Sequence, residues 1–255
     1  MTSSPTLASP WFVRPPAAGP PAARLFCFPF SGSGASAFSA WPATAGDAEI
    51  CPVQFPGREN RLAHPHYDSY ENLADQLVEA LTPLLDTPFA FFGHCAGALP
   101  AYETALRLAA AGLPTPQRLF VSGQPAPHEA AHDQMLTMSE DDLRAELVAF
   151  LLGRGLDPRP DMIDMGMAVL LRDRAAATAY RRTEPVRLDC PVTVLHWSQD
   201  TDVSLADLQG WRRYSDSVEF HVIEGGHYDF MGAPAPLLEA LVAGRDRSAA
   251  SDRGW

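Results

Sequence analysis

Short apolar runs that alternate with helical patterns constrain the fold of this chain most. Runs rich in β-branched and aromatic residues are typical of buried strands, and they span residues 24–30, 49–55, 88–93, 117–123, 191–197 and 218–224. Between most of them, apolar residues recur at helical spacing, as in the segment SYENLADQLVEALTPLL. Alternating strands and helices predict a mostly parallel central sheet flanked by helices, an α/β fold.

One interval breaks this alternation. Residues 124–190 are too long for a simple crossover, and their pattern predicts two extra helices, about 139–153 and 161–182. An insertion before the last two strands would lie above the carboxyl edge of the sheet, where ligands bind in open α/β folds. We therefore expect a helical lid within a single domain.

The domain is expected to span residues 24–245, at a length that is enough for a full hydrophobic core. It is preceded by a Pro/Ala-rich arm, residues 1–23, which is either disordered or packed over the fold. A short tail, residues 246–255, follows it.

The segment FAFFGHCAGA, residues 89–98, places a cysteine in a tight turn between a predicted strand and a predicted helix. A nucleophile flanked by glycines two positions away on each side, in that context, is the pattern of the nucleophile elbow of α/β-hydrolases. Gly93 and Gly97 occupy the flanking positions. We therefore predict that Cys95 is a nucleophile rather than a small buried residue.

An acid and a histidine follow the last two predicted strands, in the chain order that this fold requires. Asp200 follows strand 191–197 and His227 follows strand 218–224. Because these strand ends converge on the elbow, we predict that both residues act with Cys95. Asp202 competes with Asp200, which is preferred because it is nearer the strand end, and His94 is expected only to pack behind the site.

The oxyanion that forms on a carbonyl under attack requires preorganised hydrogen-bond donors. The backbone N–H of Ala96, directly after the cysteine, is one expected donor. A second is expected from the glycine-rich loop FPFSGSGAS, where either Ser31 or Gly32 can present its amide.

Several segments give the chain a specific resemblance to a known family. In order and spacing, CFPFSGSGASAF, VQFPGRENRL, PFAFFGHCAGALPAYETALRL, LFVSGQPAP, DVSLADLQGW and IEGGHYDF resemble segments of the stand-alone type II thioesterases of polyketide and nonribosomal peptide biosynthesis. The resemblance, over about residues 24–243, implies an α/β-hydrolase that hydrolyses acyl or aminoacyl thioesters on the phosphopantetheine arms of carrier proteins. It implies a Cys95, Asp200 and His227 triad, with Ser31 and Ala96 forming the oxyanion hole.

Two positions depart from the family pattern: Phe30 stands where the family usually has histidine, and Cys95 where it usually has serine. A cysteine exchanges one thioester for another, so the acyl group keeps its activation. An acyltransferase or cyclising enzyme, which passes the acyl group to a second carrier thiol or to an amine, is therefore an alternative. A noncatalytic carrier-binding protein is another, and an engineered serine-to-cysteine exchange would look the same.

Composition limits the kinds of partner that the protein is expected to bind. A formal net charge of -12 argues against a nucleic-acid partner. The absence of a long apolar run or a signal-peptide pattern predicts a soluble, cytoplasmic protein with no membrane partner, and we expect a monomer. No cofactor or metal is expected, because neither a phosphate loop nor metal-ligand spacing is present. An arginine-rich run is the candidate docking surface for an acidic carrier, unless it is only a solvated helix face: Arg172, Arg174, Arg181, Arg182 and Arg187.

Overall fold

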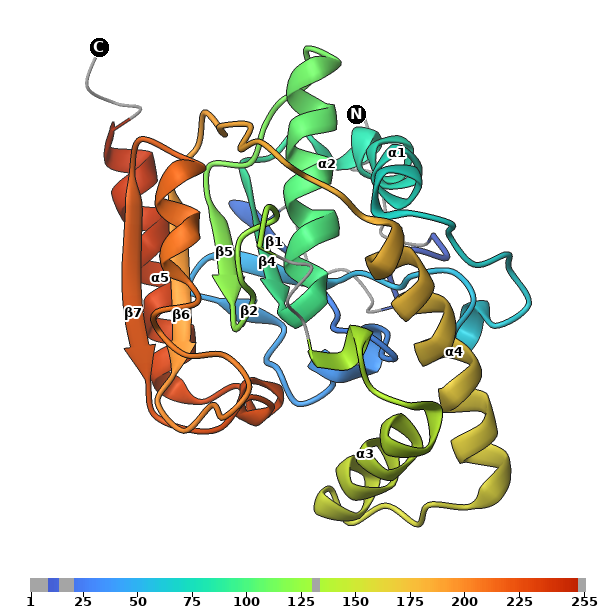
Figure 1. The fold of residues 1–255 in the computed structure, drawn as a ribbon. Helices are drawn as coiled ribbons and strands as arrows, with labels where there is room; N and C mark the ends of the chain where they lie inside the picture. The colour runs from blue at the N-terminus through green and yellow to red at the C-terminus, as the bar shows by residue number, and fades with distance from the viewer. Residues whose placement is uncertain (1–8, 14–20, 130–133, 252–255) are drawn as a thin grey trace.

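The computed structural model of the protein describes residues 9–13, 21–129 and 134–251. Its centre is a seven-stranded sheet in the order β2-β3-β1-β4-β5-β6-β7 (Figure 1). The strands are β1 (Ala23–Phe28), β2 (Thr44–Ala45), β3 (Ala48–Pro52), β4 (Phe89–His94), β5 (Leu119–Ser122), β6 (Val192–Trp197) and β7 (Val218–Ile223). All neighbouring pairs are parallel except β2 and β3, which are antiparallel. This arrangement confirms the predicted mostly parallel sheet.

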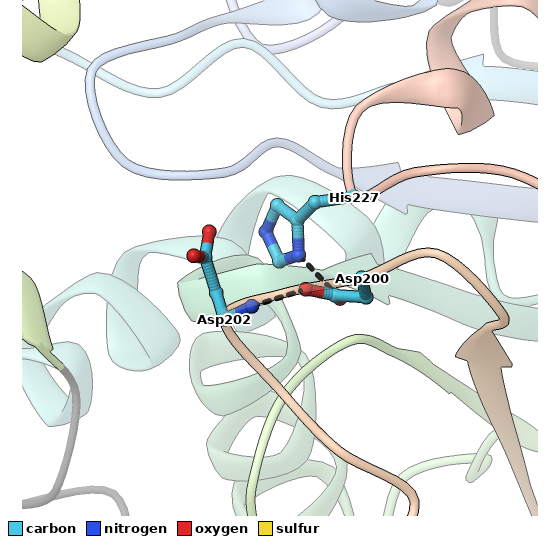
Figure 2. Close-up of side chains that lie close together, drawn as sticks. All are labelled: Asp200, Asp202 and His227. Atoms are coloured by element: carbon cyan, nitrogen blue, oxygen red, sulfur yellow. Dashed lines mark hydrogen bonds and ion pairs between the residues drawn. The ribbon is translucent and has the colours of Figure 1, made fainter.

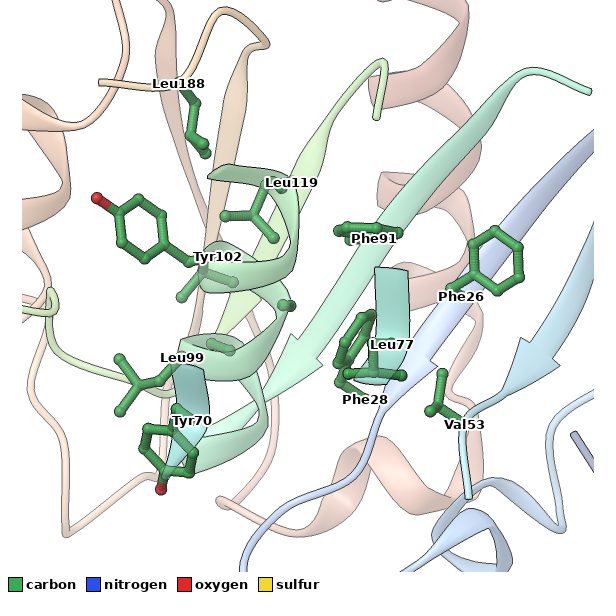
Figure 3. Close-up of a cluster of buried hydrophobic side chains, with 14 of the residues drawn as sticks. Phe26, Phe28, Val53, Tyr70, Leu77, Phe91, Leu99, Tyr102, Leu119 and Leu188 are labelled. Carbon is green, nitrogen blue, oxygen red and sulfur yellow. The ribbon is translucent and has the colours of Figure 1, made fainter. Parts of the chain in front are cut away.

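Helices cover both faces of the sheet. The α-helices are α1 (Tyr70–Leu81), α2 (Ala98–Ala110), α3 (Glu140–Gly153), α4 (Pro160–Ala179) and α5 (Ala235–Ser251). Helices α1 and α2 pack on one face, where their leucines and tyrosines meet strand residues such as Phe26 and Phe91 (Figure 3). Helix α5 packs on the other face through Leu237 and Leu241. Because both faces are covered, every residue of β1, β4 and β5 is buried, which explains their unbroken apolar runs.

Helices α3 and α4 both fall in the interval between β5 and β6 and project from one end of the molecule (Figure 1). Their bounds are close to the helices expected within residues 124–190. Residues 130–133 of that interval lie outside the described part of the chain.

At the chain ends, the described residues 9–13 fit the alternative of an arm packed over the fold, and the last helix extends into the expected tail. Phe12 is 5% exposed and packs against Phe26, so this part of the N-terminal arm lies on the core. Helix α5 continues through the boundary expected at residue 245 and ends at Ser251. Among the described residues, no helix is both long and apolar enough to cross a membrane.

A buried ion pair joins the end of α4 to α2. The carboxylate of Glu103 on α2 is completely buried and accepts hydrogen bonds from Tyr180 Oη at 2.7 Å and from Arg182 Nε and Nη2 at 2.8 and 2.6 Å. Within the arginine-rich run, Arg182 is thus paired with a buried carboxylate, although its own side chain is partly exposed. Docking of a carrier through Arg182 is therefore not supported, because its guanidinium is already paired.

Arg182→Glu is expected to destabilise the fold by about 3 to 5 kcal/mol, because it removes the partner of a buried carboxylate and adds a second negative charge beside it. Urea unfolding followed by circular dichroism measures the change. Arg181→Glu is the matched control, since Arg181 donates only to the carbonyl of Tyr180. Equal stability of the two variants would contradict a structural role for Arg182.

Candidate active site

The strand, turn and helix predicted around the cysteine are present, and the turn is strained. Strand β4 ends at His94, the 3₁₀ turn Cys95–Gly97 follows, and α2 begins at Ala98. Cys95 has a backbone φ of 49°, a value that residues other than glycine rarely adopt. Strained backbone of this kind clusters at reactive sites.

The two glycines of the elbow are required by close backbone contacts. A Cβ atom on Gly93 would lie 2.4 Å from the Cα of Ala98, and one on Gly97 would lie 2.4 Å from the carbonyl oxygen of Pro29. The second contact also brings the end of β1, and the loop that follows it, against the elbow.

His227 and Asp200 form a hydrogen-bonded pair at the ends of the last two strands (Figure 2). His227 Nδ1 lies 2.7 Å from Asp200 Oδ2, and the side chains are 9% and 0% exposed. The other carboxylate oxygen of Asp200 accepts from the backbone N–H groups of Asp202 and Val203, at 2.9 and 3.1 Å. The carboxylate of Asp202 also lies near the imidazole, but the hydrogen bond of His227 Nδ1 is made with Asp200 (Figure 2).

The charge on His227 is set by its two neighbours. Burial disfavours the imidazolium, but hydrogen bonds with Asp200 and Cys95 outweigh burial and raise the pKa of His227 to about 10. Burial alone would raise the pKa of Asp200, but its hydrogen bond with His227 and its two backbone donors lower it. The imidazole of His227 thus lies between Asp200 on one side and Cys95 on the other.

Three residues that the sequence did not single out lie around this pair and the neighbouring His94. Gly123, at the end of β5 with a φ of 58°, leaves no room for a side chain, because a Cβ atom there would lie 3.2 Å from His227 Cε1 and 3.4 Å from Asp200 Oδ2. Ser122 Oγ accepts a hydrogen bond from Trp197 Nε1 and lies 2.9 Å from His94 Nδ1.

His94 packs behind the site, as expected. Its ring is stacked on Phe230 at 3.9 Å and lies 4.6 Å from the ring of His227. Burial, together with the nearby His227, holds the pKa of His94 well below its ordinary value. A neutral ring can stand behind a positively charged one without repelling it.

The loop after β1 turns sharply at Phe30–Ser33. Ser33 N donates to Phe30 O at 3.1 Å, and Gly32 has a φ of 79°. Gly32 N donates to Asp173 Oδ2 at 2.7 Å, so the Gly32 amide is occupied. No described residue accepts a hydrogen bond from the Ser31 amide, which leaves Ser31 as the candidate donor on this loop. The Ala96 amide is in the first turn after Cys95, where helical amides have no partner within the helix.

An aromatic wall stands beside these groups. The ring of Phe30 lies 5.2 Å from Tyr228 and 5.9 Å from Phe150 of α3. Cys95 and Phe150 both pack against the cluster of buried residues that contains Phe30. The site is therefore apolar on the side that α3 approaches.

Asp200, Asp202 and His227 also place their ligand atoms within 4.8 Å of one another, which is close enough for a metal ion. The Asp200 and His227 atoms are already bonded to each other, so a cation would have to separate them. The donor set fits a histidine–carboxylate pair better than a metal centre.

The fold and this site are together those of an α/β-hydrolase. Comparison with known families is more specific: residues 23–243 match the thioesterase domain model, and the chain belongs to the Thioesterase family. It is therefore a hydrolase that acts on thioester bonds.

Curated relatives and solved structures agree with the family. The chain is 32% identical over 244 residues to the gramicidin S biosynthesis protein GrsT of Aneurinibacillus migulanus, covering 91% of this chain and 92% of that protein. It is 33% identical over 225 residues to the thioesterase PikA5 of Streptomyces venezuelae, covering 86% and 79%. The structure of RedJ, a thioesterase of prodiginine biosynthesis in Streptomyces coelicolor, superposes with a TM-score of 0.77 at 35% identity, covering 91% and 95% of the chains.

Proposed function

We propose that the protein is a stand-alone type II thioesterase of polyketide or nonribosomal peptide biosynthesis. Its substrates are acyl or aminoacyl groups on the phosphopantetheine arms of carrier proteins. The observation that carries the chemistry is the His227 imidazole, bonded to Asp200 on one side and contacting Cys95 on the other. Support for the pathway comes from GrsT and RedJ, whose names tie them to gramicidin S and prodiginine biosynthesis and whose lengths this chain matches.

In the acylation step, Cys95 Sγ attacks the thioester carbonyl, and the oxyanion accepts hydrogen bonds from the Ser31 and Ala96 amides. Collapse of this intermediate breaks the bond to the pantetheine sulfur. The leaving thiolate takes the proton of the His227 imidazolium, so the acyl group is now carried on Cys95 and the imidazole is neutral. Asp200 keeps the imidazole oriented throughout.

In the deacylation step, neutral His227 takes a proton from water while the water oxygen attacks the acyl-cysteine carbonyl. The same two amides donate hydrogen bonds to the second oxyanion. Its collapse releases the carboxylic acid and returns the Cys95 thiolate beside a protonated His227.

Acyl transfer is a second candidate, and the cysteine itself favours it. The acyl-enzyme formed on Cys95 is a thioester, so exchange with a second thiol is close to energetically neutral. An amine can also attack it. In this case the second carrier or the amine replaces water in the deacylation step.

The carrier protein is the proposed partner, and we propose that the protein acts in the cytoplasm as a monomer. We further propose that α3 and α4 form the lid expected for residues 124–190 over the single domain of residues 24–245. Phe150 supports this role, because it brings α3 to the aromatic wall beside Cys95.

Intact-protein mass spectrometry with an acyl-loaded carrier tests the proposal. A mass increase equal to the acyl group is expected on the wild-type protein, followed by its decay to free acid. Addition of an unloaded second carrier separates the two candidates: hydrolysis gives acid at the same rate, whereas transfer moves the acyl group to the new carrier. If acid is released and Cys95 never carries the acyl group, the covalent mechanism is wrong. If neither turnover nor an adduct occurs, the noncatalytic alternative stands.

A further inference from the structure

A buried carboxylate of α4 lies beside the loop that carries Ser31. Asp173 is 1% exposed, and all of its polar contacts come from three segments outside the helix. Its Oδ1 lies within 2.8 Å of Arg58 Nη2, His66 Nε2 and Tyr67 Oη. Its Oδ2 accepts from Arg58 Nη1 at 2.8 Å and from the Gly32 amide at 2.7 Å. Both carboxylate oxygens are thus fully engaged.

Asp173 keeps its charge although it is buried. Burial alone would raise its pKa, but the facing Arg58 and the hydrogen bonds around the carboxylate hold the pKa well below its usual value. Arg58 is fixed in turn, since its guanidinium lies 5.5 Å from the ring centres of both Phe55 and Tyr67. The Arg58–Asp173 pair is a rigid charged support beneath the loop.

This support holds the backbone of the turn at two points. Asp173 binds the amide of Gly32, and Arg58 Nη1 donates to the carbonyl of Ser33 at 3.0 Å. Leu170, one turn before Asp173 on α4, fills the space beside Gly32, where a Cβ atom would lie 2.6 Å from Leu170 Cδ2. The turn therefore rests on α4 through both a hydrogen bond and a packing contact.

The direction of the Ser31 amide depends on these contacts. Ser33 donates to the carbonyl oxygen of Phe30 through its backbone N–H at 3.1 Å and through its hydroxyl at 2.8 Å. The Phe30 carbonyl and the Ser31 N–H belong to one planar trans peptide, so they point in opposite directions. Fixing Ser33 fixes the Phe30 carbonyl, and this fixes where the Ser31 N–H points.

We propose that Asp173 is a positioning residue for the oxyanion hole: through Gly32, and through Arg58 and Ser33, it aims the Ser31 amide at the developing oxyanion. The inference rests on the proposed function of Cys95 and Ser31. The inference also gives this part of the helical insertion a separate role. The part of α4 around Leu170 and Asp173 supports the loop that carries Ser31, and it cannot move away without releasing the Ser31 amide.

The matched variants are Asp173→Asn and Tyr67→Phe. An asparagine has one acceptor oxygen and an NH₂ group, so it cannot serve both the Gly32 amide and the bidentate Arg58. Tyr67→Phe removes one donor to Asp173 but leaves the contacts to Gly32 and Arg58 intact. Both variants disturb the buried cluster, and only the first is expected to misdirect Ser31.

The decisive measurement compares the inhibition constants of an acyl trifluoromethyl ketone and the matching methyl ketone. Cys95 Sγ adds to the carbonyl of the trifluoromethyl ketone, and this addition places an oxyanion in the hole. For Asp173→Asn, binding of the trifluoromethyl ketone is expected to weaken at least tenfold, while binding of the methyl ketone is unchanged. With an acyl-N-acetylcysteamine thioester, kcat is expected to fall about 10- to 100-fold at constant KM. This is less than the roughly 10²- to 10³-fold cost of removing one oxyanion donor, because the Ser31 amide is misdirected but still present. Tyr67→Phe is expected to leave the ratio of the two inhibition constants as in the wild type.

Three results would overturn the inference. A folded Asp173→Asn protein with the wild-type ratio of inhibition constants would make the carboxylate purely structural, as would an equal change in Tyr67→Phe. If Asp173→Asn does not fold, Ser33→Ala is the substitute variant, because it removes the hydroxyl bond to Phe30 at a partly exposed position. It should raise the inhibition constant of the trifluoromethyl ketone, divided by that of the methyl ketone, two- to fivefold; no change in this ratio would reject the inference. Wild-type protein that forms no adduct with the trifluoromethyl ketone would instead overturn the proposed function itself.

Discussion

Cys95→Ala is expected to lower kcat/KM for an acyl-carrier substrate by about 10⁴-fold or more, the scale seen when a covalent nucleophile is removed from a triad. Alanine cannot form the acyl-enzyme, and the residual rate depends on the oxyanion donors alone. Turnover measured with the loaded carrier, together with intact mass, checks both the rate and the loss of the adduct.

Two other substitutions test whether the loss of turnover in Cys95→Ala is specific to the cysteine of the elbow. Cys190→Ala is the control for general effects of losing a thiol, because Cys190 is buried and burial raises the pKa of its thiol to about 12. It should keep full adduct formation. Cys95→Ser would form an oxygen ester in place of a thioester and should release only free acid, even with an acceptor carrier present. Turnover in Cys95→Ala close to that of the wild type would contradict a nucleophilic role.

Asp200→Asn is expected to lower kcat by about 10³- to 10⁴-fold, as in other triads that lose the carboxylate behind the histidine. The substitution removes the negative charge that stabilises the imidazolium and allows the wrong tautomer of His227. The rate of acid release from the loaded carrier under saturating conditions measures this effect.

Asp202→Asn is the matched control, because it changes a neighbouring carboxylate that is not the one hydrogen-bonded to His227 Nδ1. The backbone N–H of residue 202 still donates to Asp200, so a change of less than about threefold is expected. A larger loss in Asp202→Asn than in Asp200→Asn would reverse the assignment of the acid.

The sequence predicts the sheet and the reactive groups because both depend on local patterns. Strands buried on both faces appear as unbroken apolar runs, and a tight elbow requires Gly93 and Gly97 around its central residue. Asp200 and His227 are found by their positions directly after strands. The fold follows from the alternation, and the preference for Asp200 over Asp202 follows from its position nearer the strand end.

The supporting contacts leave no such pattern. Asp173 sits within an ordinary helical stretch, and its partner Arg58 is 115 residues away in the sequence. In the sequence, Arg182 cannot be told from a surface charge, because its partner Glu103 lies on a distant helix, α2. Gly123 and Phe150 likewise have their roles only because distant segments pack together. These roles depend on tertiary packing, which spacing along the chain does not encode.

The order of the strands has a consequence for synthesis on the ribosome. Cys95 follows β4, near the middle of the chain, whereas Asp200 and His227 follow β6 and β7. During synthesis, the segment with β1, β3, β4, β5 and the elbow leaves the ribosome before the last two strands. In the proposed mechanism the cysteine lacks both its acid and its base until then, so we expect the growing polypeptide to be inert towards acyl thioesters until translation is nearly complete.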